Sequence, residues 1–401
     1  MEHGLNFAVV ATIAGCLVLW SLVSARLERW NITAPMAFVA VGLLSANGPT
    51  GFLHVGIGST GLGELAEITL AIVLFGDAAQ VNVRKLRGDA GLPGRLLGVG
   101  LPLTMALGTV GAKLLFPDLS WWVCAVIGAA VAPTDAALGV AIIEDERVPN
   151  RIRRVLNVES GLNDGIVTPF VNFFIVGAVV GTALETESDG HALLGLLIGV
   201  VGGALIGAIG GRLMRWAKTS GVGGTTYRGV GVASLAILSY AGVVELDGNG
   251  FVAAFVAGLA FGAVTLETER EASLEFTHGS AELLSTSVWF MFGAAMVPLL
   301  DDISWQDLVF AIAALTVIRM VPVAISLIGT GFDRSTISVI GWFGPRGLAS
   351  VVFALLAVEG LAPGDGERAV VIITATVLAS VVLHGVSAAP IAGRYGAGHH
   401  D

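Results

Sequence analysis

Long apolar runs separated by short polar breaks fill the chain. A helix needs about 20 apolar residues to cross a bilayer, and by that measure the runs predict about thirteen transmembrane helices, although the second, eighth and ninth are short. The runs lie near residues 5–24, 33–47, 64–82, 93–116, 121–142, 155–183, 190–213, 228–243, 250–264, 279–300, 305–328, 335–358 and 368–393. They are continuous, not alternating, which favours helices over a membrane β-barrel. We therefore predict an all-α polytopic membrane protein with one membrane domain over residues 1–401.

Charged residues are scarce. Lys and Arg number 21 and Asp and Glu 31, together 13% of 401 residues, whereas soluble domains carry about 25%. This composition excludes an ordinary soluble enzyme, a disordered chain and a disulfide-stapled secreted module. The formal net charge of −10 argues against nucleic acid as a partner. Cys16 and Cys124 both lie in apolar runs and are interpreted as small buried hydrophobic residues.

Basic residues predict the orientation of the chain. If the N-terminus is outside, 17 of the 21 basic residues fall in cytoplasmic loops: Arg26, Arg29, Arg84, Lys85, Arg87, Arg95, Arg147, Arg151, Arg153, Arg154, Arg212, Arg215, Lys218, Arg228, Arg270, Arg334 and Arg394. Outside loops hold only Lys113 and Arg368. This positive-inside bias supports an odd number of spans and a cytoplasmic C-terminus. The first run has no basic region before it, so we interpret it as a span and not as a signal peptide.

Two spans are interrupted in mid-membrane by Pro and Gly together with a charge. The fifth contains Ala132-Pro133-Thr134-Asp135, and the twelfth contains the segment from Gly341 to Gly347, GWFGPRG. They lie seven spans apart and cross the membrane in opposite directions, as paired broken helices of inverted repeats do in secondary transporters. We predict a first six-helix repeat over 1–183, a linker helix over 190–213 and a second repeat over 228–393, with the broken helices crossing at the midplane. The linker has Gly at every fourth residue from 195 to 211, which predicts close helix packing.

Six ionisable residues fall inside apolar runs, where charge is costly and indicates function. They are Asp77, Asp135, Glu159, Asp164, Arg319 and Arg346. Asp135 lies nine residues before Glu144, about 13 Å along a helix, and Asp164 lies ten residues after Arg154, about 15 Å. Both carboxylates are therefore expected near the bilayer middle, where repulsion and desolvation favour proton uptake and a bound cation opposes it. Glu67 and Glu282 lie nearer span ends and are set aside because they can snorkel.

Hard oxygen donors surround Asp164 in the sequence. Ser160 lies four residues before it on the same helix face, and a backbone carbonyl is expected to be free near Pro133 and Thr134. Such donors suit a small alkali cation, with Asp164, Ser160 and Thr134 as predicted Na⁺ ligands. The alternative is that these polar residues only join helices.

Buried charges of opposite sign usually pair, and Arg319 is the predicted partner of Glu159. Arg346 follows the broken turn, where it either compensates half-helix dipoles or pairs with a carboxylate. Asp77 either lines a cytoplasmic funnel or bonds a neighbouring helix. His384 is interpreted as a hydrogen-bonded packing residue. With these pairings at least one buried carboxylate is left without a compensating charge, and a cation or a proton would compensate it.

The strings APTDAALG (132–139), NVESGLNDG (157–165) and GWFGPRGLAS (341–350) resemble sodium–proton antiporters and exchangers of the cation–proton antiporter superfamily. The resemblance covers essentially the whole chain, and the Asn-Asp pair matches the prokaryotic electroneutral branch. It implies a homodimer in the prokaryotic cytoplasmic (inner) membrane, with a six-helix transport unit moving against a static interface part, and no cofactor.

The same resemblance implies roles for individual residues. Asp164 would carry the cation and the proton, with Thr134 and Ser160 as further oxygen ligands. Glu159 would reach the site through water while it pairs with Arg319, and Asp135 would support the crossing, with Asn163 bonding nearby. Asn163 replaces a first carboxylate of the electrogenic branch, which implies one-for-one exchange. Many members have Pro after the Thr-Asp pair where this chain has Ala136.

The leading hypothesis is a Na⁺/H⁺ antiporter that works by alternating access, with Li⁺ or K⁺ also possible as substrates. A K⁺/H⁺ antiporter of the same family and a cation channel are the alternatives. An intramembrane aspartyl protease is remote, because neither of its Gly-x-Gly-Asp and Tyr-Asp contexts occurs here. The donor set does not distinguish Na⁺ from K⁺ or Li⁺.

Overall fold

The computed structural model describes residues 7–46, 53, 56, 59–81, 91–135, 142, 145, 147–180 and 188–398. Every regular element in these ranges is a helix. They are α1 (Phe7–Glu28), α2 (Ala34–Ala46), α3 (Thr60–Gln80), α5 (Gly91–Arg95), η1 (Leu96–Gly100), α6 (Leu101–Leu115), α7 (Trp121–Ala130), α9 (Asn150–Val180), α10 (Ser188–Thr219), α11 (Thr225–Val244), α12 (Gly250–Val264), α13 (Glu267–Ala295), η2 (Val297–Asp302), α14 (Trp305–Leu315), α15 (Val317–Ser326), α16 (Arg334–Trp342), α17 (Leu348–Gly360) and α18 (Asp365–Gly398).

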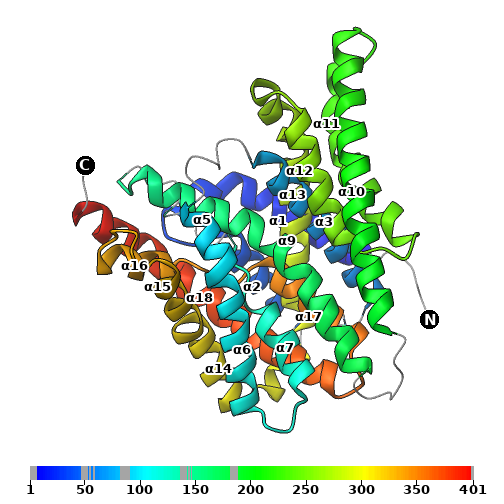
Figure 1. Ribbon diagram of the computed structural model, residues 1–401. Helices are drawn as coiled ribbons and strands as arrows, with labels where there is room; N and C mark the ends of the chain where they lie inside the picture. The colour runs from blue at the N-terminus through cyan, green and yellow to red at the C-terminus, as the bar shows by residue number, and fades with distance from the viewer. Residues whose placement is uncertain are drawn as a thin grey trace.

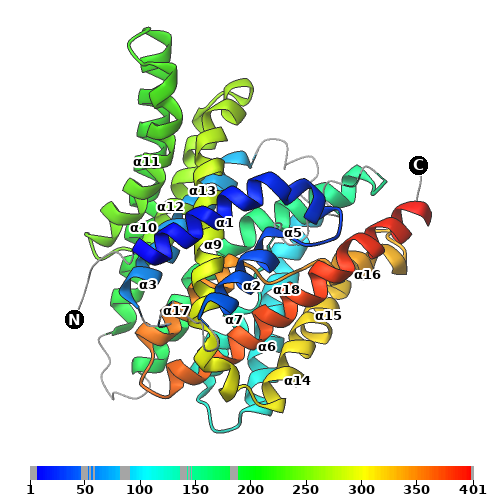
Figure 2. The ribbon, with the colours of Figure 1, turned by 180° about the vertical axis from the view of Figure 1, so that it is seen from behind.

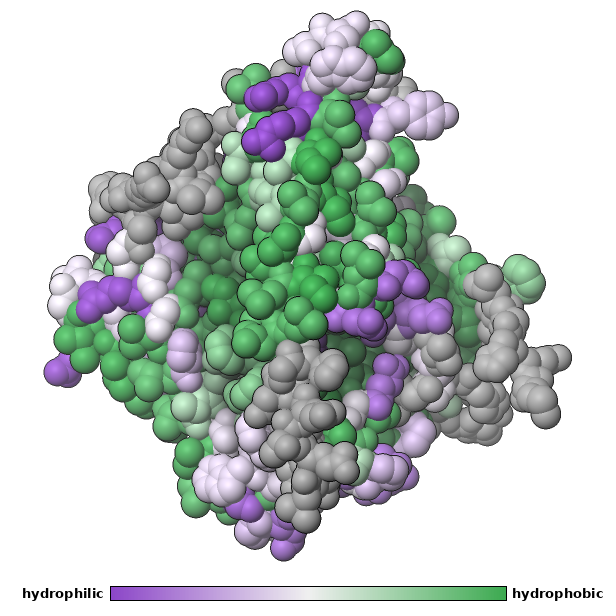
Figure 3. Space-filling view, turned by 45° about the vertical axis from the view of Figure 1, so that its right-hand side comes forward, coloured by the Kyte–Doolittle hydropathy of each residue, from purple (hydrophilic) through white to green (hydrophobic). Residues whose placement is uncertain are grey.

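The helices are suited to a bilayer. Seven helical stretches among the described residues are long and apolar enough to span a membrane, and α2, α7, α12 and α17 are shorter apolar helices. Each of the predicted apolar runs contains helix, although the number thirteen itself stays a prediction. Apolar side chains cover most of the coloured face in Figure 3, and hydrophilic ones gather at its upper end, along its left and lower edges and in one group right of the centre. The all-α polytopic membrane fold is confirmed.

The helices form two packed groups. In one group α12 lies between α10 and α3, and α13 packs against α2 and α3. In the other, α7 packs against α6 and α9, and α18 packs against α14 and α17. Figures 1 and 2 show the second group beside the first, with α10 and α11 extending beyond the other helices. Contacts of α3 with α9 and α17 join the groups, and the candidate site lies at this junction.

Glycines allow the close packing that the linker pattern predicted. A Cβ atom on Gly203 or Gly207 of α10 would overlap backbone atoms of Ala253 or Ala257 on α12. Gly258 of α12 approaches the backbone of α3 in the same way. The glycine series is therefore a packing surface that brings α10, α12 and α3 into one tight layer.

Both predicted breaks are present. α7 ends at Ala130, after which residues 131–135 are not helical, and residues 343–347 separate α16 from α17. Residues 136–139 of the first quoted string, including Ala136, lie outside the described residues, as do residues 181–183 at the end of the predicted first repeat. The division into two inverted repeats stays a prediction.

Two irregularities were not predicted. The run 305–328 was expected to be one helix but breaks at Thr316, whose φ and ψ are −112° and −94°. An Arg346 guanidinium nitrogen donates to the Ala314 carbonyl (2.9 Å), which replaces a helical hydrogen bond there. In the fourth span, η1 is π-helical, with Leu101 N–H bonded to Leu96 O. The next residue, Pro102, has no N–H to donate to the carbonyl four residues earlier, so the regular pattern is interrupted there.

Candidate functional site

The two helix breaks cross and are joined by direct hydrogen bonds. The Asp135 backbone N–H donates to the Pro345 carbonyl (2.8 Å), and the Leu348 N–H donates to the Asp135 carboxylate (3.2 Å). The Ser350 hydroxyl donates to the Ala130 carbonyl (2.7 Å), the last of α7. Groups that lost helical partners at each break therefore find partners in the other break. Asp135 is thereby fixed at the crossing with one carboxylate oxygen bonded to the start of α17.

Helix α9 is bonded to the first break through Thr134. The Ser160 hydroxyl donates to the Thr134 carbonyl (2.8 Å). The Asn163 amide donates to the same carbonyl (3.2 Å) and to the Thr134 hydroxyl (2.7 Å). All three side chains are buried. The structure thus brings Thr134, Ser160 and Asn163 into one hydrogen-bonded cluster. Ser160 and Asn163 lie within about one helical turn of Asp164 on α9.

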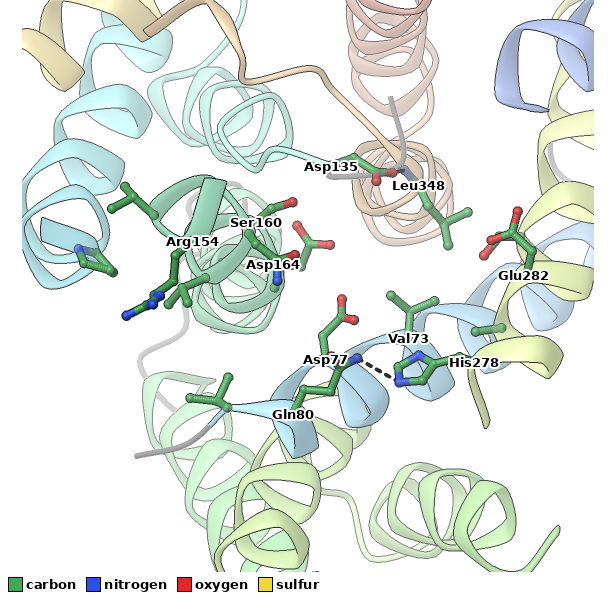
Figure 4. Close-up of a pocket in the computed structure, with 18 of the residues that line it drawn as sticks. Val73, Asp77, Gln80, Asp135, Arg154, Ser160, Asp164, His278, Glu282 and Leu348 are labelled. Atoms are coloured by element: carbon green, nitrogen blue, oxygen red, sulfur yellow. Dashed lines mark hydrogen bonds between the residues drawn. The ribbon is translucent and has the colours of Figure 1, made fainter. Parts of the chain in front are cut away.

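A cavity of about 790 Å³ lies between the two helix groups. Three of the acids that the sequence predicted line it: Asp77 from α3, Asp135 from the first break and Asp164 from α9. Figure 4 shows their carboxylates directed into the open space, with Ser160 beside Asp164. Gly161, on α9 between Ser160 and Asp164, faces Asp77 so closely that an added Cβ would stand 3.5 Å from the Asp77 Cβ. Asp77 therefore lies at the cavity wall, and the cytoplasmic funnel stays a prediction.

The opposite wall of the cavity belongs to α13. His278 and Glu282 line it, four residues apart on one helix face, and Gln80 Nε2 of α3 donates to His278 Nε2 (2.8 Å). Figure 4 shows Glu282 facing the cavity from the side opposite Asp164. Glu282 was not predicted to belong to the site, because it lies near a span end where its side chain could snorkel. Its spacing from His278 was the available signal that both share a face.

Glu159 faces away from this cavity into a sealed environment. Its side chain and that of Arg319 are each 1% exposed, and the two form an ion pair with Nη1 and Oε1 2.6 Å apart. A second guanidinium nitrogen donates to Glu159 Oε2 (2.9 Å). Gly344 allows Arg319 to pass the second break, because a Cβ there would stand 2.6 Å from Arg319 Nε. The pair neutralises two charges without contact with the cavity.

Arg346 is fully buried at the same break. Its guanidinium donates to the carbonyls of Gly344 (2.6 Å) and Ala314 (2.9 Å). Ala314 is the penultimate residue of α14, so the positive charge lies at the negative end of a half-helix. Of the two interpretations for Arg346, the contacts correspond to dipole compensation.

These acids do not form a closed metal shell. Among the described residues, no three His, Cys, Asp or Glu side chains approach as closely as ligands of one metal ion would. Within the same ranges no hydrogen bond reaches the Asp164 carboxylate, whereas Glu159 is paired. The arrangement is an open acidic cavity lined by Asp164 and Ser160, and it is suited to a cation that enters and leaves. Thr134 is bonded to Ser160 but lies outside the cavity lining.

Comparison with known proteins agrees with this architecture. The model of the family described as sodium/hydrogen exchanger, transmembrane, matches residues 10–393. The chain is 26% identical over 366 residues to a K⁺/H⁺ antiporter NhaP2 of Shewanella sp. (strain MR-4), covering 89% of this chain and 61% of that protein. It is 25% identical over 361 residues to a Na⁺/H⁺ antiporter of Schizosaccharomyces pombe, covering 81% of this chain and 76% of that protein.

A solved structure shares the fold. The sodium proton antiporter MjNhaP1 of Methanocaldococcus jannaschii superposes with a TM-score of 0.77 at 19% identity, covering 98% of each chain. The chain spans 61% of the length of the Shewanella relative. Since the family model extends over nearly all of its residues, this multi-pass membrane protein belongs to the transmembrane sodium/hydrogen exchanger family.

Proposed function

We propose that this protein exchanges a monovalent cation, Na⁺ most readily, for H⁺ by alternating access. The observation that carries the proposal is the division of buried charge. Among the described residues, the two fully buried arginines bond elsewhere, Arg319 to Glu159 and Arg346 to backbone carbonyls, while Asp77 and Asp164 face a cavity that Arg151 and Arg154 also line. Asp77 and Asp164 therefore offer carboxylates whose charge a cation or a proton can neutralise.

Asp164 is the proposed carrier of both ions. Ser160 donates its hydrogen to Thr134, so the lone pairs of its oxygen remain available to a cation beside the Asp164 carboxylate. The Thr134 carbonyl or hydroxyl supplies a further hard oxygen donor. A proton on Asp164 removes the charge that attracts the cation, so the two ions compete for one site. Asn163 carries no proton, which supports one-for-one, electroneutral exchange.

Asp135 and Asp77 have separate proposed roles. Asp135 supports the crossing, since its carboxylate accepts from Leu348 N–H. Asp77 lines the route to Asp164 and attracts cations there. Glu159 and Arg319 form a structural pair, and Arg346 stabilises the broken helix. No cofactor takes part, because the cation and the proton are both cargo.

Alternating access follows from the two helix groups. The group with α6, α7, α9 and α14–α18 holds the crossing and Asp164, and the group with α2, α3 and α10–α13 supplies the other wall. Movement of the first group against the second would expose Asp164 to each side in turn. Arg151 and Arg154 line the cavity, and by the predicted orientation they are cytoplasmic, so the described state is open inward.

Setting and partners are proposed from the family and the charge pattern. We place the protein in a prokaryotic inner membrane as a homodimer, with the N-terminus outside and the C-terminus inside. The two inverted repeats, over 1–183 and 228–393, remain part of the proposal, with residues 190–213 as the linker.

K⁺/H⁺ exchange is the second candidate, because the Shewanella relative bears that name and oxygen donors also accept K⁺. A cation channel would show no coupling to protons. An intramembrane protease would cleave a membrane peptide, and the family relatives are named as antiporters.

The test uses purified protein in proteoliposomes with an imposed pH gradient and a fluorescent pH indicator. Addition of Na⁺, Li⁺ or K⁺ in turn should dissipate the gradient, with Na⁺ the most effective. A membrane potential clamped at zero should leave the rate unchanged if exchange is electroneutral. Cation flux that persists unchanged at clamped equal pH without proton movement would indicate a channel and overturn the proposal.

A further inference from the structure

Three polar side chains on one face of α18 contact the second helix break. Ser380, His384 and Ser387 are spaced by four and three residues, which places them on the same side of the helix. Their partners are the side chain and carbonyl of Trp342 and the backbone N–H of Arg346, at the two ends of the non-helical segment. This set lies outside the cavity lining and outside the residues used in the proposed exchange.

His384 connects both ends of the break. Its Nε2 lies 2.9 Å from the carbonyl of Trp342, the last residue of α16. Its Nδ1 lies 3.1 Å from the Ser380 hydroxyl, which in turn accepts from the Arg346 backbone N–H (2.6 Å). Nδ1 also lies 3.1 Å from the Ser380 carbonyl. With the ring proton on Nε2, His384 donates to the Trp342 carbonyl and accepts from the Ser380 hydroxyl. The ring is 1% exposed and Ser380 is fully buried.

These contacts satisfy groups that the break leaves without helical partners. The Trp342 carbonyl ends α16 and also accepts the Gly344 N–H (2.7 Å), whereas the Arg346 N–H, before the first turn of α17, donates to Ser380. Neither group takes part in a regular helix ladder. A buried polar group without a partner costs free energy comparable to a lost hydrogen bond. The Trp342 and His384 rings also stack, with centroids 5.0 Å apart. α18 therefore holds both ends of the non-helical segment by hydrogen bonds.

The same segment carries the crossing. The carbonyl of Pro345, next to Arg346, accepts a hydrogen bond from the Asp135 backbone N–H. Thr134, the residue before Asp135, accepts hydrogen bonds from the side chains of Ser160 and Asn163. A displacement of residues 342–346 is thus transmitted through two hydrogen-bonded steps to the oxygen donors beside Asp164. We propose that His384, acting with Ser380, is a positioning residue for cation binding, which it serves through the geometry of the crossing without touching the ion. The inference rests on the proposed cation exchange.

The test measures the apparent KM for Na⁺ and the maximal rate in proteoliposomes. His384→Leu should raise KM about fivefold, the ratio that corresponds to one net hydrogen bond, while the maximal rate per folded protein changes less. His384→Gln should return KM toward the wild-type value, because an amide donor can reach the Trp342 carbonyl. Ser380→Ala removes the hydroxyl that joins His384 to the Arg346 backbone N–H, and it should also raise KM.

Thr376→Val is the matched control. Thr376 is buried on α18, and its hydroxyl donates to Ile372 of the same helix, so its loss removes a buried hydroxyl without touching the break. Its KM should equal that of the wild type even if the melting temperature falls. A wild-type KM in both His384→Leu and Ser380→Ala would overturn the positioning role, and so would a KM for Thr376→Val raised as much as theirs. If wild-type protein itself shows no cation-dependent proton flux, the proposed function fails instead.

Discussion

Two acids on α9, five residues apart, have opposite surroundings. Glu159 is sealed against Arg319, with side chains 1% exposed and a separation of 2.6 Å. Asp164 faces a cavity of about 790 Å³ together with Asp77 and Asp135. A charge that is neutralised in place stabilises the fold but cannot be exchanged, whereas a charge open to the cavity can take up whichever cation is present. One helix therefore carries both a neutralised ion pair and the proposed cation site.

Asp164→Asn should have the largest effect on transport. The amide removes the charge that binds the cation and the group that carries the proton. Cation-driven dissipation of a pH gradient in proteoliposomes should fall to the rate of vesicles without protein. Asp301→Asn, an exposed acid in η2, is the matched control and should transport like the wild type. Normal transport by Asp164→Asn would place the carrier elsewhere.

Glu159→Gln should affect stability more than any cavity substitution. It leaves the Arg319 charge buried without its partner, which costs about 3–5 kcal/mol. Thermal unfolding in detergent should show a clear loss in melting temperature. The double variant Glu159→Gln with Arg319→Met should recover much of this loss, because neither position then carries a buried charge without its partner. If the single variant is as stable as the wild type, the pair is not the structural element described here.

Asp77→Asn should weaken cation binding without abolishing exchange. A unit charge a few Å from the ion at a partly solvated wall contributes about 1–4 kcal/mol, so KM is expected to rise by between about fivefold and several hundredfold. Glu282→Gln removes a carboxylate from the opposite wall of the same cavity and should raise KM less. Complete loss of transport in Asp77→Asn would make Asp77 part of the carrier itself.

Ser160→Ala should have the smallest effect. It removes one neutral oxygen donor and one hydrogen bond to Thr134, worth about 1 kcal/mol, or about fivefold in KM. The pH dependence of transport should keep its shape, since Ser160 does not titrate. A changed pH profile would show that Ser160 influences the proton site and not only the cation.

Much of this organisation could be predicted from the sequence. Apolar run length predicted the helices. Pro133 with Asp135, and Pro345 with Gly344, Gly347 and Arg346, predicted the two breaks. The break at Thr316 could not be predicted, because its replacement hydrogen bond comes from Arg346, thirty residues away. Glu282 was missed for a related reason. The position of a residue within a span indicates its depth in the membrane, but it does not indicate whether its helix face lines a cavity.

The contacts of α18 show the same limit. Ser380, His384 and Ser387 form an obvious face, yet their partners on the second break become visible only in three dimensions. Apolar periodicity assigns residues to a helix face, whereas hydrogen bonding across helices depends on packing.

Calorimetry of Na⁺ binding to the purified protein, repeated in buffers of different ionisation enthalpy, tests the central claim most directly. Competition at Asp164 predicts release of about one proton per cation bound over the pH range in which the site titrates, with apparent affinity falling as pH drops. Asp164→Asn should neither bind Na⁺ measurably nor release protons. Cation binding that releases no protons at any pH, with an affinity independent of pH, would contradict the account.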